Sequence, residues 1–245
     1  MVHQSAASGY QLNSDTYASI RPSYHPKLVQ RFVENVPQGV MVELGAGTGI
    51  FTSHLVQAGY SPIAIEPLAE MRSKLARRFP AVDVREGTAE DTGLETGSVD
   101  TVVVAQAFHW FNYQAALAEI KRILRPQGLL TCVWNVRDES VEWMRNYEEA
   151  LNQYAGDTPR HRTMAWRQAI DSDTSFELMD EWAIPNPQPI NQEGVVKRAL
   201  STSFIAMLDP DEQQRVLESV RQIVSTLGER FDFPYHSELQ VWRKC

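Results

Sequence analysis

Cysteine is nearly absent from this chain of 245 residues. Its two cysteines are Cys132, inside an apolar run, and Cys245, the last residue. Neither position fits a disulfide framework or a redox pair, because both need cysteines at characteristic spacings. The six histidines are scattered, and no H-x-x-x-H or C-x-x-C pattern occurs. We therefore expect no metal site and no structural disulfide.

Long apolar runs and surplus positive charge are also missing. No run approaches the roughly 18 residues of a membrane-spanning helix, and residues 1–10 lack the basic and apolar regions of a signal peptide. Acidic residues outnumber basic ones by 31 to 23, which gives a formal net charge of −8 and a pI of about 5.3. Binding to nucleic acids and anionic membranes depends on clustered Lys and Arg. We expect a soluble cytoplasmic protein, monomeric or homodimeric, with neither of these partners.

The composition supplies enough apolar surface for one sizeable core. Hydrophobic residues make up 43% and charged residues 22% of the sequence, which is ordinary for a globular protein. We expect a single domain over residues 1–245. In it, residues 1–36 form N-terminal cap helices, residues 37–135 form a cofactor-binding core, and residues 136–245 form a substrate cap that also completes the sheet.

Short apolar runs alternate with helical patterns through the first half of the chain. The run at 99–105 is almost wholly apolar and β-branched, as expected for a central strand covered on both faces. This alternation predicts a doubly wound α/β sheet, in which ligands bind at the carboxyl ends of the strands. The expected strands are residues 39–44, 62–65, 81–85, 99–105 and 129–134, and the expected helices are residues 15–20, 25–36, 50–58, 68–79 and part of 108–124.

The pattern changes in the second half, which we interpret as a cap woven into the sheet edge. Residues 156–169 mix Pro, Arg, His and Trp and indicate a looser segment. The expected helices are residues 141–154, 193–208 and 211–227, and the expected strands lie within residues 176–190 and 233–243.

A strand, a glycine turn and a helix follow one another at Val42-Glu43-Leu44-Gly45-Ala46-Gly47-Thr48-Gly49. Glycines allow a tight turn and a close backbone approach, and the N–H groups of the next helix point at the ligand. Two cofactor classes suit this order, a dinucleotide and S-adenosylmethionine, and Glu66 after the second strand fits either. Dinucleotide sites favour G-x-G-x-x-G. Here the third glycine comes one residue early and Ile50 follows, which favours S-adenosylmethionine.

The chain resembles class I S-adenosylmethionine-dependent methyltransferases, and in detail the small-molecule branch that includes trans-aconitate methyltransferases. The resemblance covers roughly residues 15–135 and implies a seven-stranded Rossmann-like methyltransferase sheet with helical cap elements. It rests on residues 42–49, on Ile65-Glu66-Pro67 followed by Met71, on Gly87-Thr88-Ala89-Glu90, on Gln106-Ala107-Phe108-His109-Trp110-Phe111, and on Tyr17 with Arg21-Pro22-Ser23-Tyr24-His25-Pro26.

The same resemblance implies the residues of the site. The backbone at Gly45 and Gly47 approaches the methionine portion of S-adenosylmethionine, and Glu66 binds its ribose. The Ala89 N–H and the Glu90 side chain bind the edge of its adenine. Gln106 lies beside the sulfonium, and His109 and Gln106 are the implied catalytic residues. The implied cofactor contacts are Glu43, Gly45, Ala46, Gly47, Glu66, Pro67, Met71, Thr88, Ala89, Glu90 and Gln106, and the implied substrate contacts are Tyr17, Arg21, Tyr24, His109, Trp110 and Trp134.

The sequence leaves the methyl acceptor open, although we favour oxygen, in a carboxylate or hydroxyl group of a small molecule. A carboxylate, with a reference pKa near 4, needs no base at pH 7. A hydroxyl or ammonium acceptor must lose a proton, and His109 is then the best candidate. The arginines that could bind a carboxylate acceptor are Arg21, Arg137, Arg160 and Arg162. The aromatic residues that could line a pocket for a ring-bearing acceptor are Tyr17, Tyr24, Trp134, Trp143 and Trp166.

Two other functions remain as alternatives. The first is a nicotinamide-dependent oxidoreductase, which the early third glycine disfavours. The second is a protein that binds S-adenosylmethionine without catalysing a reaction.

Overall fold

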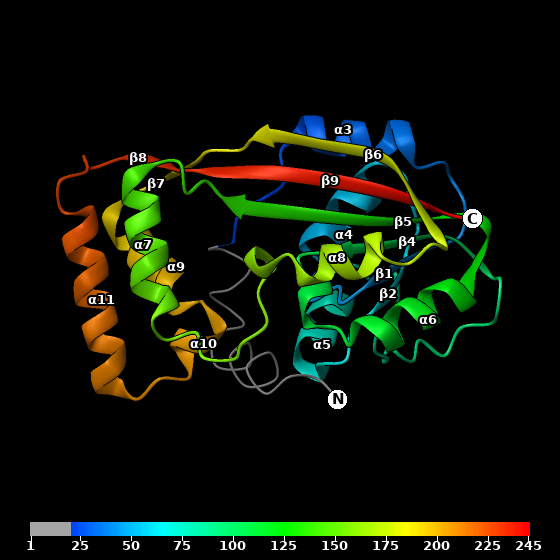
Figure 1. The fold of residues 1–245 in the computed structure, drawn as a ribbon, viewed down its shortest axis with the longest axis horizontal. Helices are drawn as coiled ribbons and strands as arrows, with labels where there is room; N and C mark the ends of the chain where they lie inside the picture. Colours follow the sequence, from blue (N-terminus) through cyan, green and yellow to red (C-terminus); the bar gives the residue numbers. More distant parts are fainter. Residues whose placement is uncertain (1–20) are drawn as a thin grey trace.

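A seven-stranded sheet forms the centre of the computed structural model, which describes residues 21–245 (Figure 1). Tyr17 and the helix expected at residues 15–20 lie outside the described residues. The strand order is β3-β2-β1-β4-β5-β9-β6, with β9 antiparallel to both of its neighbours. The strands are β1 (Met41–Leu44), β2 (Ile63–Ile65), β3 (Asp83–Arg85), β4 (Val99–Ala105), β5 (Leu124–Arg137), β6 (Phe176–Pro185) and β9 (Tyr235–Lys244).

The sheet reverses its strand order between β1 and β4. Val42 of β1 is in register with Ile63 of β2 on one side and with Val102 of β4 on the other, and all three strands are parallel. Chain connections leave β1 and β4 in opposite directions across the sheet, which opens a crevice at their carboxyl ends. The predicted α/β fold class is confirmed, and the switch point lies at the predicted glycine turn.

Helices cover both faces of the sheet, and the alternation of side chains along β4 explains why. Val102 and Val104 pack in one core cluster, whereas Val103 packs in the cluster on the opposite face, and all three are fully buried. In Figure 1, α3 and α6 lie on opposite sides of the sheet. The helices of this region are α3 (Pro26–Asn35), α4 (Ile50–Gln57), α5 (Ala69–Arg78), the 3₁₀ turn η1 (Phe108–Trp110), α6 (Tyr113–Ile123), the 3₁₀ turn η2 (His161–Thr163) and α8 (Ala165–Asp171).

A second group of helices, here called the helical cap, lies beside the end of β5 (Figure 1). It has its own core, in which Tyr147, Val195 and Val220 are fully buried. The cap consists of α7 (Glu142–Asn152), α9 (Gln192–Leu200), α10 (Ser203–Ala206), α11 (Pro210–Val224) and the strand pair β7 (Gln188–Ile190) and β8 (Phe231–Phe233). The predicted division of the chain at residues 36 and 135 stays a prediction.

Two expectations for the second half were wrong. The segment expected to be loose contains α8, because Trp166 and Ile170, four residues apart, bury one helical face against the sheet. The single helix expected at residues 193–208 is divided into α9 and α10 by Ser201 and Thr202. In the described part of the chain, every helix is too short or too polar to cross a membrane.

Candidate active site

A cavity of about 320 Å³ opens where the carboxyl ends of β1, β2, β4 and β5 face the helical cap. The residues predicted to contact the cofactor all line it, although their contacts stay predictions. They are Glu43, Gly45, Ala46, Gly47, Glu66, Pro67, Met71, Thr88, Ala89, Glu90 and Gln106.

The glycine turn after β1 adopts a conformation that other residues resist. Gly45 and Gly47 have φ angles of +67° and +59°, in the left-handed region. A Cβ added at Gly45 would lie 2.7 Å from the Cβ of Ala107, closer than two such atoms can approach. The N–H groups of Gly45 and Ala46 both donate to the carbonyl of Ile65, at 2.9 and 3.2 Å. The turn is therefore drawn against the end of β2.

Glu66 is fixed at the end of β2 by backbone donors. Its Oε2 accepts the N–H of Gly47 at 2.8 Å, and its Oε1 accepts that of Leu68 at 2.9 Å. Arg72 donates to the Glu66 carbonyl at 2.9 Å. Burial raises the pKa of Glu66, although the two backbone hydrogen bonds oppose the shift. The carboxylate is thus held at the junction of the glycine turn and the predicted ribose position.

Glu43 is a second buried carboxyl group at this end of the cavity. It is 1% exposed, and its Oε2 accepts the Thr52 hydroxyl at 2.6 Å. Burial raises its pKa to about 8, with the Thr52 hydrogen bond opposing the shift and the charge of Glu66 adding to it. At neutral pH Glu43 therefore holds its proton in the protein without a ligand.

The turn at residues 87–91, which is predicted to contact adenine, also has a structural role. Thr88 and Asp91 close it with reciprocal backbone hydrogen bonds of 3.0 and 3.3 Å. Glu90 accepts the N–H of Asn112 at 2.8 Å, and Asn112 is the N-cap of α6. One carboxylate oxygen of Glu90 thus fixes the start of a helix.

Gln106 lies at the switch point with a left-handed backbone. Its φ is +59°, unusual for a residue other than glycine, and such strain concentrates at functional sites. Its side-chain Nε2 donates to the Asn135 carbonyl at 3.0 Å, and its N–H donates to the Val133 carbonyl at 2.9 Å. The residue predicted to lie beside the sulfonium is therefore tied to the end of β5.

His109 is held in its neutral form. Burial lowers its pKa from 6.5 to about 3, and the charges of His161, Arg160 and Arg21 add to the shift. Its Nδ1 is buried and has no hydrogen-bond partner within residues 21–245. Burial also lowers the pKa of His161 to about 4. Two neutral imidazoles therefore stand at this end of the cavity.

The predicted substrate residues divide into three groups. Arg21, Tyr24, His109 and Trp110 line the cavity, and Tyr17 is outside the described residues. Trp134 is a correction, because it is 0% exposed and lies outside the cavity lining. Its ring packs 5.6 Å from His109, 4.5 Å from His161 and 4.6 Å from Trp166, measured between ring centroids. Trp134 therefore supports the cavity wall from behind.

The end of the cavity next to the helical cap carries a dense set of charges. The carboxylate of Glu148 on α7 pairs with Arg160 at 3.1 Å and with Arg137 at the end of β5. Burial opposes ionisation of Glu148, but the two arginines hold its pKa below the ordinary value. Glu139 and Arg162 form another pair across 3.3 Å. These two carboxylates face the four cavity-lining arginines that the sequence offered for a carboxylate.

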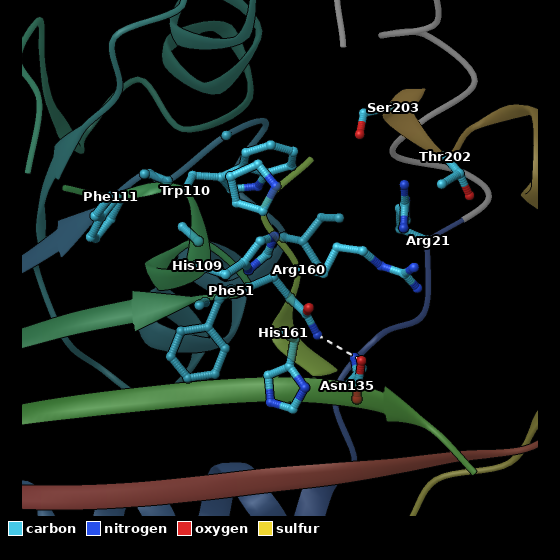
Figure 2. Close-up of a pocket in the computed structure, with 18 of the residues that line it drawn as sticks. Arg21, Phe51, His109, Trp110, Phe111, Asn135, Arg160, His161, Thr202 and Ser203 are labelled. Carbon is cyan, nitrogen blue, oxygen red and sulfur yellow. Dashed lines mark hydrogen bonds between the residues drawn. The ribbon is translucent and has the colours of Figure 1, made fainter. Parts of the chain in front are cut away.

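Cap residues in the lining were missed by the sequence reasoning. Thr202 lies in the break between α9 and α10 and Ser203 begins α10, both inside a segment expected to be one helix. Figure 2 shows them beside Arg21, away from Trp110 and Phe111 on the other side of the cavity. The break has no strong sequence signal, because neither proline nor glycine marks it.

Comparison with known proteins decides the family. A profile of the methyltransferase domain matches residues 42–132, from the glycine turn into β5. An uncharacterized methyltransferase-like protein of Schizosaccharomyces pombe is 31% identical over 231 residues, which cover 93% of this chain and 90% of that protein. The chain belongs to the methyltransferase family. It is an S-adenosylmethionine-dependent methyltransferase of class I, and the trans-aconitate branch stays a prediction.

Solved structures of methyltransferases share the fold. A putative type II methyltransferase from Anaeromyxobacter dehalogenans aligns with a TM-score of 0.63 at 21% identity, covering 91% of this chain and 97% of the other. A geranyl diphosphate C-methyltransferase from Streptomyces coelicolor, solved with Mg²⁺, geranyl diphosphate and S-adenosylhomocysteine, aligns with a TM-score of 0.51 at 13% identity, covering 89% of this chain and 77% of the other. The comparisons do not favour the nicotinamide-dependent alternative.

Proposed function

We propose that this methyltransferase transfers a methyl group from S-adenosylmethionine to a carboxylate oxygen of a small anionic acceptor. The observation that carries the proposal is the division of charge within one cavity. Two carboxylates, Glu66 and Glu90, line the end near the glycine turn, beside the protonated Glu43. At the other end, among the described residues, four arginines line the cavity beside Glu139 and Glu148, namely Arg21, Arg137, Arg160 and Arg162.

The glycine-turn end suits S-adenosylmethionine. A Cβ at Gly45 would clash with Ala107, so only glycine lets the turn pack this closely, and the sulfur of Met71 lies 3.9 Å from the position that a Cβ on Gly47 would take. Gly45 and Gly47 would then lie along the methionine portion, Glu66 would accept the ribose hydroxyls, and Glu90 would face the adenine. S-adenosylmethionine supplies a methyl group on a positively charged sulfur, and the carboxylates of Glu66 and Glu90 favour a cation.

The arginine end suits an anionic acceptor. A guanidinium group matches a carboxylate with two parallel N–H donors. Arg160 lies over the Phe204 ring at 5.5 Å while its other side pairs with Glu148, so its orientation is fixed. Arg21 donates to the Ser201 carbonyl at 2.8 Å and is thereby held against the cap. Fixed charges of this kind orient an acceptor without reorganising during the reaction.

The chemistry needs no base when the acceptor is a carboxylate. A carbon–oxygen bond forms as the carbon–sulfur bond breaks, the electron pair passes to sulfur, and no proton moves. His109, with its pKa of about 3, is too weak a base to deprotonate a hydroxyl or ammonium group efficiently at pH 7. We therefore assign to His109 a hydrogen bond with the acceptor. We assign to Gln106 the positioning of the methyl donor against that acceptor.

The test is the chemical lability of the product. The protein would be incubated with S-adenosylmethionine labelled in its methyl group and, in separate reactions, with the anionic and the neutral fractions of a metabolite extract. A methyl ester releases labelled methanol in mild alkali, whereas methyl ethers, N-methyl and C-methyl products keep the label. We expect alkali-labile label, strongly reduced in Arg160→Gln and unchanged in Arg215→Gln, an exposed arginine outside the cavity.

Each other outcome contradicts a stated part of the proposal. Alkali-stable label would exclude a carboxylate acceptor. Transfer to compounds in the neutral fraction, insensitive to Arg160→Gln, would exclude an anionic one. Binding of S-adenosylhomocysteine without any labelled product would favour the non-catalytic binding protein.

A further inference from the structure

A short segment crosses the cavity from the cap to the sheet. Residues 21–25, here called the strap, precede α3, and Arg21, Pro22 and Tyr24 line the cavity. At one end, Arg21 donates to the Ser201 carbonyl of the cap at 2.8 Å. At the other end, the N–H of His25 donates to the Ser237 hydroxyl of β9 at 3.3 Å. The strap therefore connects the two walls of the site.

A buried set of polar side chains lies beneath the strap. Asn186 is 5% exposed and Ser237 is 0% exposed. The Ser237 hydroxyl donates to Oδ1 of Asn135 at 2.5 Å, and Nδ2 of Asn186 approaches the same Oδ1 at 3.1 Å and the Ser237 hydroxyl at 2.9 Å. These three residues, here called the hub, come from β5, from the β6–β7 connection and from β9.

Side chains of the hub form hydrogen bonds with the backbone of the strap. Nδ2 of Asn186 donates to the Ser23 carbonyl at 2.8 Å, the shortest contact between hub and strap. Asn135 donates to the carbonyls of Pro22 and Ser23 at 3.3 and 3.4 Å. The Asn186 amide cannot turn over freely, because its Oδ1 accepts Nε2 of Gln188 at 2.9 Å. Its nitrogen is therefore kept pointing at the strap.

We propose that Asn186 is a positioning residue for the methyl acceptor, acting through the strap on Arg21. Asn186 lies between Pro185 and Pro187, whose rings fix the backbone φ angles on both sides. The amide is thus presented from a stiff connection. Asn186 itself lies outside the cavity lining. The proposal rests on the proposed function in one respect, namely that Arg21 faces the acceptor.

The effect of losing Asn186 should be confined to the acceptor end. The middle of the strap has separate attachments to α4, because the Ser23 hydroxyl lies 3.1 Å from Nε2 of His54, and the Tyr24 ring packs on Phe51 with centroids 5.0 Å apart. These contacts keep the strap folded when the hub is weakened. What changes is the placement of the backbone between Arg21 and Ser23.

The test compares Asn186→Leu with Ser237→Ala and a control, Gln192→Leu. Gln192 also donates its side-chain amide to a backbone carbonyl, that of Leu227 at 2.9 Å, but in the cap. Hydrogen–deuterium exchange of the peptide containing residues 23–25 would report the strap. Calorimetry with S-adenosylhomocysteine would report the donor end. A dilution series of the metabolite extract with labelled S-adenosylmethionine would give the half-saturating amount of acceptor and the maximal rate.

We expect Asn186→Leu to speed exchange in the strap and to raise the half-saturating amount of acceptor about tenfold, the scale of one lost buried hydrogen bond. The maximal rate and the affinity for S-adenosylhomocysteine should stay within about twofold, because the donor end is held by other residues. Ser237→Ala should change exchange in the strap and the half-saturating amount of acceptor by less than Asn186→Leu does. Gln192→Leu should change neither of these two quantities.

Three results would overturn the proposal. Unchanged exchange in the strap would show that Asn186 does not hold it. Faster exchange with an unchanged half-saturating amount would show that the strap does not position the acceptor. A loss of S-adenosylhomocysteine affinity as large as the rise in the half-saturating amount of acceptor would show that the hub supports the fold as a whole or the donor end. Should Asn186→Leu fail to fold, Ser237→Ala decides by the same readouts. A wild-type protein that labels nothing contradicts the proposed function, while exchange still decides whether Asn186 holds the strap.

Discussion

The backbone N–H of Gly47 donates to the Glu66 carboxylate across 2.8 Å, which joins the turn after β1 to the end of β2. The glycine turn and the predicted ribose carboxylate are therefore one unit. A change at Glu66 should alter the shape of the turn as well as the predicted contact with the ribose. Burial raises the pKa of Glu66, so the backbone donors also help to keep the group in its ionised form.

Glu66→Ala should weaken binding of S-adenosylhomocysteine by about 1.5 to 3 kcal/mol, the scale of a charge-assisted hydrogen bond whose partners are left unpaired. Isothermal calorimetry would measure it. Glu86→Ala is a matched control, because Glu86 pairs with the same Arg72 at 2.8 Å and is largely exposed. Equal affinities of the wild type and Glu66→Ala would remove the ribose role of Glu66.

The stability of the protein should depend on the proton of Glu43. Burial raises its pKa from 4.5 to about 8. Between these values the folded state holds a proton that the unfolded chain has released, so the free energy of unfolding falls as pH rises through this window. Glu43→Gln should flatten that slope, measured by urea denaturation, whereas exposed Glu95→Gln should leave it unchanged. A constant difference between wild type and Glu43→Gln at every pH would contradict the assignment.

The rate of methyl transfer should be insensitive to pH around 6.5. The pKa of His109 is lowered to about 3, mainly by burial, so the ring stays neutral throughout this range. His109→Gln should reduce the maximal rate less than the roughly 100-fold minimum expected for loss of a general base. A rate that declines below pH 6.5 in the wild type but not in His109→Gln would instead establish His109 as a base.

Trp134 should affect stability more than catalysis. Its side chain is 0% exposed and packs between Trp166 and the two histidines. Trp134→Ala should lower the free energy of unfolding by about 3 to 5 kcal/mol through the cavity it leaves. Trp134→Phe should cost less and should keep the acceptor half-saturation of the wild type. A large rise in that quantity for Trp134→Phe, with unchanged stability, would restore Trp134 to the substrate site.

The parallel core and the cavity lining around the glycine turn could be predicted because their signals are local. The turn containing Gly45 and Gly47 follows directly on β1, and Glu66 directly on β2, so parallel strands bring them to one edge. The run at 99–105 matched β4 in full, since a strand covered on both faces has a continuous apolar sequence.

The acceptor end could be predicted only in part because it is assembled over long sequence distances. Arg21 meets Ser201 across 180 residues, and Asn186 meets Ser23 across 163. No local pattern encodes such pairs. Trp134 was misplaced for a different reason: it occupies a strand end near the site, but alternation along β5 turns its side chain to the face shared with Cys132.

Strand β9 lies antiparallel between β5 and β6, so this part of the sheet can pair only after the C-terminal part of the chain has been synthesised. Strands β1 to β5 leave the ribosome first, and one side of β5 stays unpaired until residues 235–244 of β9 have been synthesised. An unpaired, largely apolar strand edge is an aggregation hazard for a nascent chain. The same late strand carries Tyr235 and Ser237 to the cavity and the hub. The acceptor end therefore takes shape last, when the sheet closes its open edge.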